Sequence, residues 1–109
     1  MSSLEDGREA FKDFNKLTTF YSEMGSLTDG TEMFSGCYSL SDFDAKLDKL
    51  ETGTKMFYRC SALQPFYNEL GALKTGDEMF KGCRLLPNWR IKLKSLVNGN
   101  GMFEGCYEL

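Results

Sequence analysis

The feature that most constrains this chain is a 23-residue period that runs through nearly all of its 109 residues. Eight columns of residues recur at this step without an insertion, dividing one domain into repeats 2–24, 25–47, 48–70 and 71–93 and a partial repeat 94–109. Three columns keep one residue type throughout: Leu4, Leu27, Leu50, Leu73 and Leu96; Gly7, Gly30, Gly53, Gly76 and Gly99; and Phe11, Phe34, Phe57, Phe80 and Phe103. Because one repeat cannot bury its own apolar face, we expect the repeats to stack into a solenoid.

The order of apolar residues within a repeat predicts two local elements. In the second repeat, Met33, Phe34 and Cys37 stand at i, i+1 and i+4, which is the spacing of one face of a short helical turn. The glycine column precedes this set, and we expect these glycines to adopt positive φ in a tight bend. The segment from Leu40 to Phe43 follows the cysteine, and we interpret it as a short strand.

One motif of the repeat resembles a known family. The stretch Phe34-Ser35-Gly36-Cys37-Tyr38-Ser39-Leu40 has the form Phe-x-Gly-Cys-x-x-Leu and returns at residues 57–63, 80–86 and 103–109. At this period it resembles the BspA-type leucine-rich repeats of bacterial surface proteins and of some protists and phages. The resemblance implies an α/β solenoid: a right-handed leucine-rich-repeat-like coil with short parallel strands on one face and short helical turns opposite. It also implies adhesion or protein interaction, without catalytic residues.

The four cysteines recur at a spacing of 23, unlike the close pairs of zinc sites. Neighbouring coils stack about 4.7–4.9 Å apart, which lies within the Cα separations of about 4.4–6.8 Å that a disulfide allows. Phe14 occupies the cysteine column in the first repeat, and this predicts an apolar core column of free cysteines. Disulfides, and a metal or redox site, are the alternatives. We expect no cofactor, and methionines that fill the core.

The residues on either side of the Phe/Trp column predict a partner-binding face. They change from repeat to repeat, whereas the core columns stay constant, which is typical of a recognition surface on a repetitive scaffold. Tyr21 and Tyr67 are the expected anchors, because tyrosine is enriched at interface hot spots. The alternative is that these residues are merely solvated. The candidate partner-binding residues are Thr19, Tyr21, Asp42, Asp44, Tyr67, Asn88 and Arg90.

The charges are unevenly distributed. The formal net charge is −3, so the chain lacks the global basic field of non-specific nucleic-acid binders. Residues 1–47 carry nine acids and four bases, whereas residues 48–109 carry seven acids and nine bases. This asymmetry suggests end-to-end homo-oligomers. A basic patch suited to an acidic partner or to phosphates, or else a solvated rim, comprises Lys81, Arg84, Arg90, Lys92 and Lys94.

The absence of histidine argues against an enzyme, because it removes the commonest general base. Asp42 and Asp44 are the only close acidic pair on the expected face, and no catalytic partner is recognisable near them. We therefore expect a non-enzymatic protein–protein interaction module that binds another protein through its strand face. It would be a small stand-alone inhibitor or adaptor of phage or mobile-element type, for example anti-defence.

Two other functions remain open. The chain is alternatively a fragment of a bacterial cell-surface adhesin, or a protein that contacts nucleic acid through the basic patch at 81–94. The sequence contains no run of about 20 apolar residues, so it predicts no membrane span. Residues 1–7 lack the features of a signal peptide. The expected location is the cytoplasm, or the cell surface if the chain belongs to a longer secreted protein.

Overall fold

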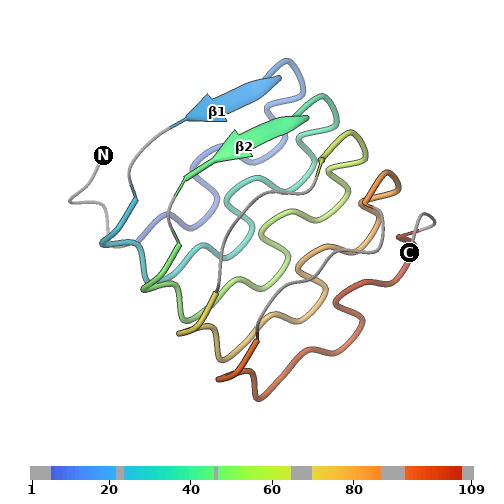
Figure 1. The fold of residues 1–109 in the computed structure, drawn as a ribbon. Helices are drawn as coiled ribbons and strands as arrows, with labels where there is room; N and C mark the ends of the chain where they lie inside the picture. The colour runs from blue at the N-terminus through green and yellow to red at the C-terminus, as the bar shows by residue number, and fades with distance from the viewer. Residues whose placement is uncertain (1–5, 22–23, 46, 65–69, 87–92, 107–109) are drawn as a thin grey trace.

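The chain winds into a stack of coils that lie side by side (Figure 1). The computed structural model describes residues 6–21, 24–45, 47–64, 70–86 and 93–106. Parallel bridges join successive coils, pairing Asp6 with Asp29, Asp29 with Thr52, Thr52 with Thr75 and Thr75 with Asn98. Every bridge joins residues 23 apart, so the period of the sequence is also the period of the stack.

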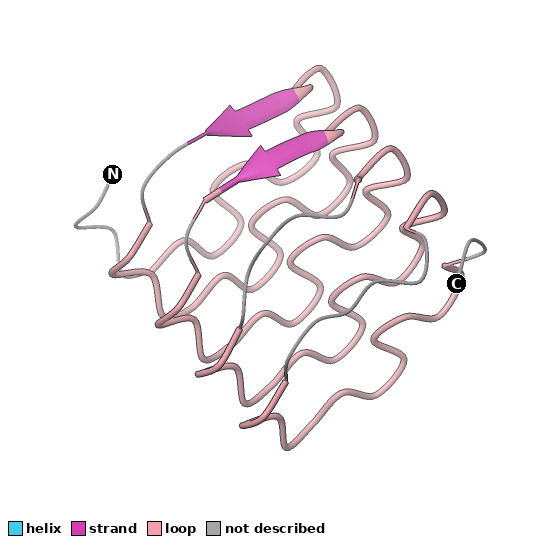
Figure 2. Cartoon of the chain, viewed as in Figure 1, coloured by secondary structure: helices cyan, strands magenta, loops and turns pink. Residues whose placement is uncertain are grey.

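Two short parallel strands lie along one side of this stack (Figure 2). They are β1 (Thr19–Tyr21) and β2 (Asp42–Asp44), and their middle residues, Phe20 and Phe43, are paired in register and buried. The expected parallel strands are therefore confirmed in these two coils. The equivalent segments of the next two coils fall largely in residues 65–69 and 87–92, outside the described residues.

The segment on the other side of each coil is not a helix, and the described residues contain no helix at all. In the second coil, Met33 N–H donates to the Gly30 carbonyl at 3.0 Å, but Phe34 N–H donates to the Met56 carbonyl of the next coil at 2.9 Å. A helix needs consecutive right-handed residues, and two left-handed residues interrupt each coil. These pairs are Glu9 and Asp13, Glu32 and Gly36, Lys55 and Arg59, Glu78 and Gly82, and Gly101 and Gly105.

The predicted helical turns are therefore not confirmed. Their place is taken by a ladder of turns, in which alternate N–H groups bond within the coil and to the next coil. The handedness of the solenoid stays a prediction.

The core is continuous from coil to coil because its columns stack directly. The Phe11, Phe34, Phe57, Phe80 and Phe103 rings follow one another at 5.4, 5.6, 5.5 and 5.5 Å between centroids, with interplanar angles of 3–6°. The strand phenylalanines meet this row edge-on, as at 4.9 Å between Phe20 and Phe34. Each fully buried side chain of this size contributes about 1.5–3 kcal/mol to stability. Because these side chains pack against those of adjacent coils, each coil is stabilised by its neighbours and not by its own contacts alone.

The glycine column corrects one expectation. Its members do not have positive φ, so a left-handed bend is not what selects glycine here. The reason is space: a Cβ on Gly7 would lie 2.8 Å from the Sδ of Met33, and a Cβ on Gly30 would lie 2.9 Å from the Sδ of Met56. At Gly7, Gly30 and Gly53 the methionine of the next coil therefore packs directly against the backbone, and glycine leaves room for it.

The four cysteines are buried free thiols, and each is hydrogen-bonded to the coil before it. The Cys60 thiol donates to the Phe34 carbonyl at 3.1 Å, and the other three make the same contact at 3.1–3.2 Å. Burial raises the pKa of Cys37 to about 11 and also raises the pKa of Cys60. Phe14, which shares the cysteine column, is 49% exposed, so it does not fill a core position as the cysteines do. It stands in the first coil of the described residues, where no described coil precedes it.

Candidate protein-binding faces

The strand face, defined here by Thr19, Tyr21, Asp42 and Asp44, is exposed on β1 and β2. Because side chains alternate along a strand, burial of the middle phenylalanine turns its two neighbours outward. The register places Thr19 beside Asp42 and Tyr21 beside Asp44. Tyr21 is 66% exposed, so most of this residue is not packed in the core. A partner that covers Tyr21 therefore also reaches the Asp44 carboxylate.

Several predicted site residues fall where the structure gives no description. Their roles stay predictions from the sequence. On the strand side these are Tyr67, Asn88 and Arg90, and in the basic patch they are Arg90 and Lys92.

The described members of the basic patch have different surroundings. Lys81 Nζ lies 3.6 Å from a Glu78 carboxylate oxygen and 3.8 Å from a Glu104 oxygen, so its charge is already paired. Lys94 lies along the preceding coil, with its Cε 3.2 Å from where a Cβ on Gly71 would stand. The two carboxylates beside Lys81 make it less suited to binding a phosphate than the sequence suggested.

Arg84, the third described member, lines a hollow that the sequence analysis missed. We call it the arginine hollow, and it measures about 410 Å³. Arg59 also lines it, with φ at 60°, and the Arg59 guanidinium lies 5.2 Å from the centre of the Tyr58 ring. A signal was available, since Arg59 replaces glycine in a column that is glycine in three other repeats. The residues lining the hollow are Tyr38, Arg59, Ser61, Gly82, Arg84 and Gly105.

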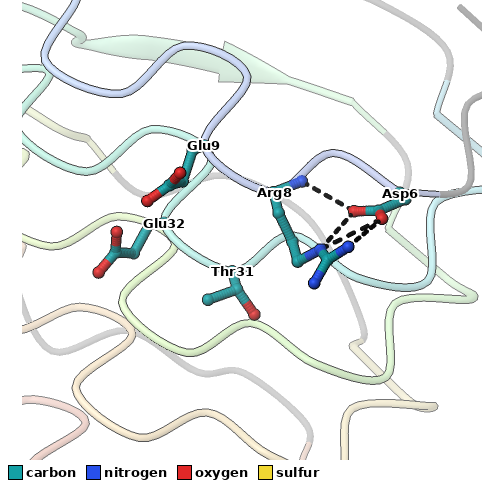
Figure 3. Close-up of a pocket in the computed structure, with 5 residues that line it drawn as sticks. All are labelled: Asp6, Arg8, Glu9, Thr31 and Glu32. Atoms are coloured by element: carbon teal, nitrogen blue, oxygen red, sulfur yellow. Dashed lines mark hydrogen bonds and ion pairs between the residues drawn. The ribbon is translucent and has the colours of Figure 1, made fainter.

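A second hollow, of about 610 Å³, lies at the first coils and is lined by Asp6, Arg8, Glu9, Thr31 and Glu32 (Figure 3). The Arg8 guanidinium turns toward Asp6 and donates to its carboxylate at 2.8–3.2 Å. These bonds lower the pKa of Asp6 and raise the pKa of Arg8. Lys12 bonds to Glu32 at 2.7 Å and to Glu9 at 3.4 Å. The charged side chains that line this hollow thus form ion pairs within the molecule.

The arrangement of acids and cysteines offers no metal centre in the part of the chain that is described. No three such side chains come close enough together there to hold a metal ion. The chemistry that the described surface does offer is hydrogen bonding, ion pairing and aromatic contact, which are the means of protein recognition.

Comparison with known families agrees with this geometry. The model of the BspA type leucine rich repeat region matches residues 5–109, in six copies. The chain belongs to the BspA-type leucine-rich repeat family. No curated protein and no solved structure matches it significantly.

The BspA-type repeat is in general a non-enzymatic fold for protein interaction. Among the residues described, no helix is long and apolar enough to cross a membrane.

Proposed function

We propose that this BspA-type repeat domain binds a partner protein through its strand face. The observation that carries the proposal is the contrast between a constant interior and a changing exterior. Phe20 and Phe43 are both buried, whereas the exposed residues around them change from Thr19 and Tyr21 to aspartates in the next coil. Packing does not require this change, because neither aspartate is part of the core.

Tyr21 is the expected centre of the interface. Tyrosine combines a large apolar surface with a hydroxyl and loses little conformational freedom on binding. Asp42 and Asp44 add two carboxylates, so the partner is expected to present a cation or hydrogen-bond donors opposite them. The proposed face extends along the same columns to Tyr67, Asn88 and Arg90.

Within this proposal the domain acts without catalysis, as an inhibitor or adaptor of phage or mobile-element type. A segment of a cell-surface adhesin is the alternative. The two differ in where the partner is found, so the domain is to be tested both against a cytosolic lysate and against intact cells. Capture from the lysate alone supports the inhibitor or adaptor, and binding to intact cells supports the adhesin.

The test of the strand face compares variants at exposed positions. Tyr21→Ala and Asp44→Asn alter the face, while Phe14→Ala removes an exposed ring elsewhere and serves as the control. We expect Tyr21→Ala to weaken binding of the captured partner by about 10-fold or more, as for an interface anchor. Equal affinity of Tyr21→Ala, Asp44→Asn and the original domain would contradict the proposal.

A further inference from the structure

The ladder of turns has a direction along the stack. At each junction between described coils, four N–H groups of one coil donate to carbonyls of the next coil, at 2.7–3.0 Å. The donors are alternate residues: Gly30 N–H donates to the Thr52 carbonyl, and Glu32 N–H donates to the Thr54 carbonyl. Each inner coil therefore presents donors to the coil after it and acceptors to the coil before it.

The fifth coil carries the donors of this ladder without their acceptors, because the described part of the chain offers them no carbonyl. These donors are the N–H groups of Gly99, Gly101, Phe103 and Gly105. The first coil has the opposite pattern, since its acceptor carbonyls receive no N–H from any described residue. These acceptors are the carbonyls of Asp6, Arg8, Ala10 and Lys12. An edge of unpaired backbone groups is a template for pairing with another chain.

The two edges match each other in position. Gly53 N–H donates to the Thr75 carbonyl, 22 residues further on. The same step within the repeat leads from Gly99 to the carbonyl of Asp6 in a second copy. The other three donors meet the remaining acceptors in the same order. A first coil placed on a fifth coil would thus continue the ladder in the register that the other junctions have.

The row of stacked phenylalanine rings is incomplete at the same two edges. Phe34, Phe57 and Phe80, which have a ring on either side, are fully buried, whereas Phe11 and Phe103 are only partly buried. Stacking of Phe103 on Phe11 of a second copy would extend a row whose ring centres lie 5.4–5.6 Å apart. Burial of these apolar surfaces would stabilise the junction.

The charges at the two edges are complementary. Lys81 and Glu104 occupy the same column in adjacent coils, and Lys81 Nζ lies 3.8 Å from a Glu104 oxygen. In the first coil this column holds Lys12. A second copy would therefore bring its Lys12 beside Glu104, whose side chain is 65% exposed. Opposite charges in register favour this pairing of edges over the pairing of two like edges.

We propose that the fifth coil of one copy binds the first coil of a second copy, so that the solenoid continues from chain to chain. The contact is head-to-tail, and each added copy presents the same edge to the next, so association is open-ended. The inference concerns the two edges of the stack and not the strand face, so it goes beyond the binding of a partner protein.

The first test follows amide hydrogen exchange in nitrogen-15 NMR spectra as the protein concentration is raised. We expect exchange of the Gly99, Gly101 and Phe103 amides to slow, because a second copy supplies their acceptors. The Met102 and Glu104 amides are the controls, since they already donate within the coil at 3.2 Å and should change less. If the molecular mass grows while the alternate amides keep their exchange rates, association uses another surface and the inference fails.

The second test reverses one charge at the junction and measures association by light scattering at low ionic strength. Glu104→Lys places a lysine beside Lys12 of the next copy, and we expect it to weaken association about 5-fold. Glu51→Lys is the matched control and is expected to leave association unchanged. Its carboxylate also pairs with a lysine of the adjacent coil, Lys74, at 3.5 Å, but away from both edges.

A constant monomer mass for the original protein, or equal weakening by the two charge reversals, overturns the inference. Tyr21→Ala keeps self-association if the inference is right, because Tyr21 lies on the strand face. Failure of the strand face and failure of the head-to-tail contact are therefore distinguishable.

Discussion

The glycine column allows the packing argument to be tested at two positions of the same chain. Gly30→Ala places a methyl group 2.9 Å from the Sδ of Met56 and 3.2 Å from its Cε, closer than ordinary contact. Gly25→Ala places the same group where nothing lies within 4 Å, at a φ that is not positive. Both changes remove glycine's extra freedom in the unfolded chain, which alone stabilises by about 0.4–1 kcal/mol. The two variants therefore differ mainly in packing.

The expected magnitudes follow from these contacts. Overpacking costs about 1–3 kcal/mol, and the unfolded-chain effect offsets about 0.4–1 kcal/mol of this cost. Gly30→Ala is therefore expected to lower the free energy of unfolding by roughly 0–2.6 kcal/mol. Gly25→Ala is expected to raise it by about 0.4–1 kcal/mol. Gly76→Ala should fall between them, because its nearest neighbour, a Leu73 methyl group, is 3.3 Å away.

Urea unfolding followed by far-ultraviolet circular dichroism measures these differences as shifts of the midpoint at constant slope. The order Gly25→Ala, Gly76→Ala, Gly30→Ala, from most to least stable, is the expected result. If Gly30→Ala is as stable as Gly25→Ala, close approach of Met56 does not explain the glycine column.

Three further predictions concern other parts of the molecule. Arg59→Gly is expected to leave the thermal midpoint unchanged or to raise it, because relief of the left-handed strain offsets the lost contact with Tyr58, worth about 0.5–1 kcal/mol; a clear fall would show that the arginine supports the fold. The pKa of Cys37 is raised to about 11 from 9.0, so its contribution to stability is intact below pH 9 and is lost as the pH rises toward 11. Urea midpoints between pH 7 and 11 should fall less steeply for Cys37→Ala, and equal slopes would argue against the shift. End-to-end association predicts a scattering mass that rises with protein concentration and falls with added salt, and a constant monomer mass would rule it out.

Much of the fold follows from local patterns in the sequence. The strict period required the coils to superimpose, and the Leu-x-x-Phe segment placed Phe20 and Phe43 inside with exposed neighbours, as in β1 and β2. The cysteines were expected to be core thiols, and the four of them are buried. These features were predictable because burial by alternation and by repetition depends on which residues recur, and not on distant contacts.

The turn segment was misread because two backbones share one apolar pattern. Met33, Phe34 and Cys37 would face inward from a helical turn, and they also face inward from the ladder of turns. What separates the two is the bond from Phe34 N–H to Met56 in the next coil. That partner lies 22 residues along the chain, where a local spacing rule cannot see it.

Of the candidate sites, one was predictable from the sequence and the other was not. Exposure of Tyr21 and Asp44 was predictable from strand alternation within a repeat. The arginine hollow was not, because its lining comes from four coils and only stacking brings those residues together.

The sequence by itself determined that this chain repeats, that its repeats stack, and which columns are buried, since each of these follows from the period and from the need to cover apolar surface. Only the tertiary structure decided which N–H groups bond between coils, why glycine suits one column, and which residues line the arginine hollow. Those outcomes depend on distances between neighbouring coils, which exist only once the stack has formed.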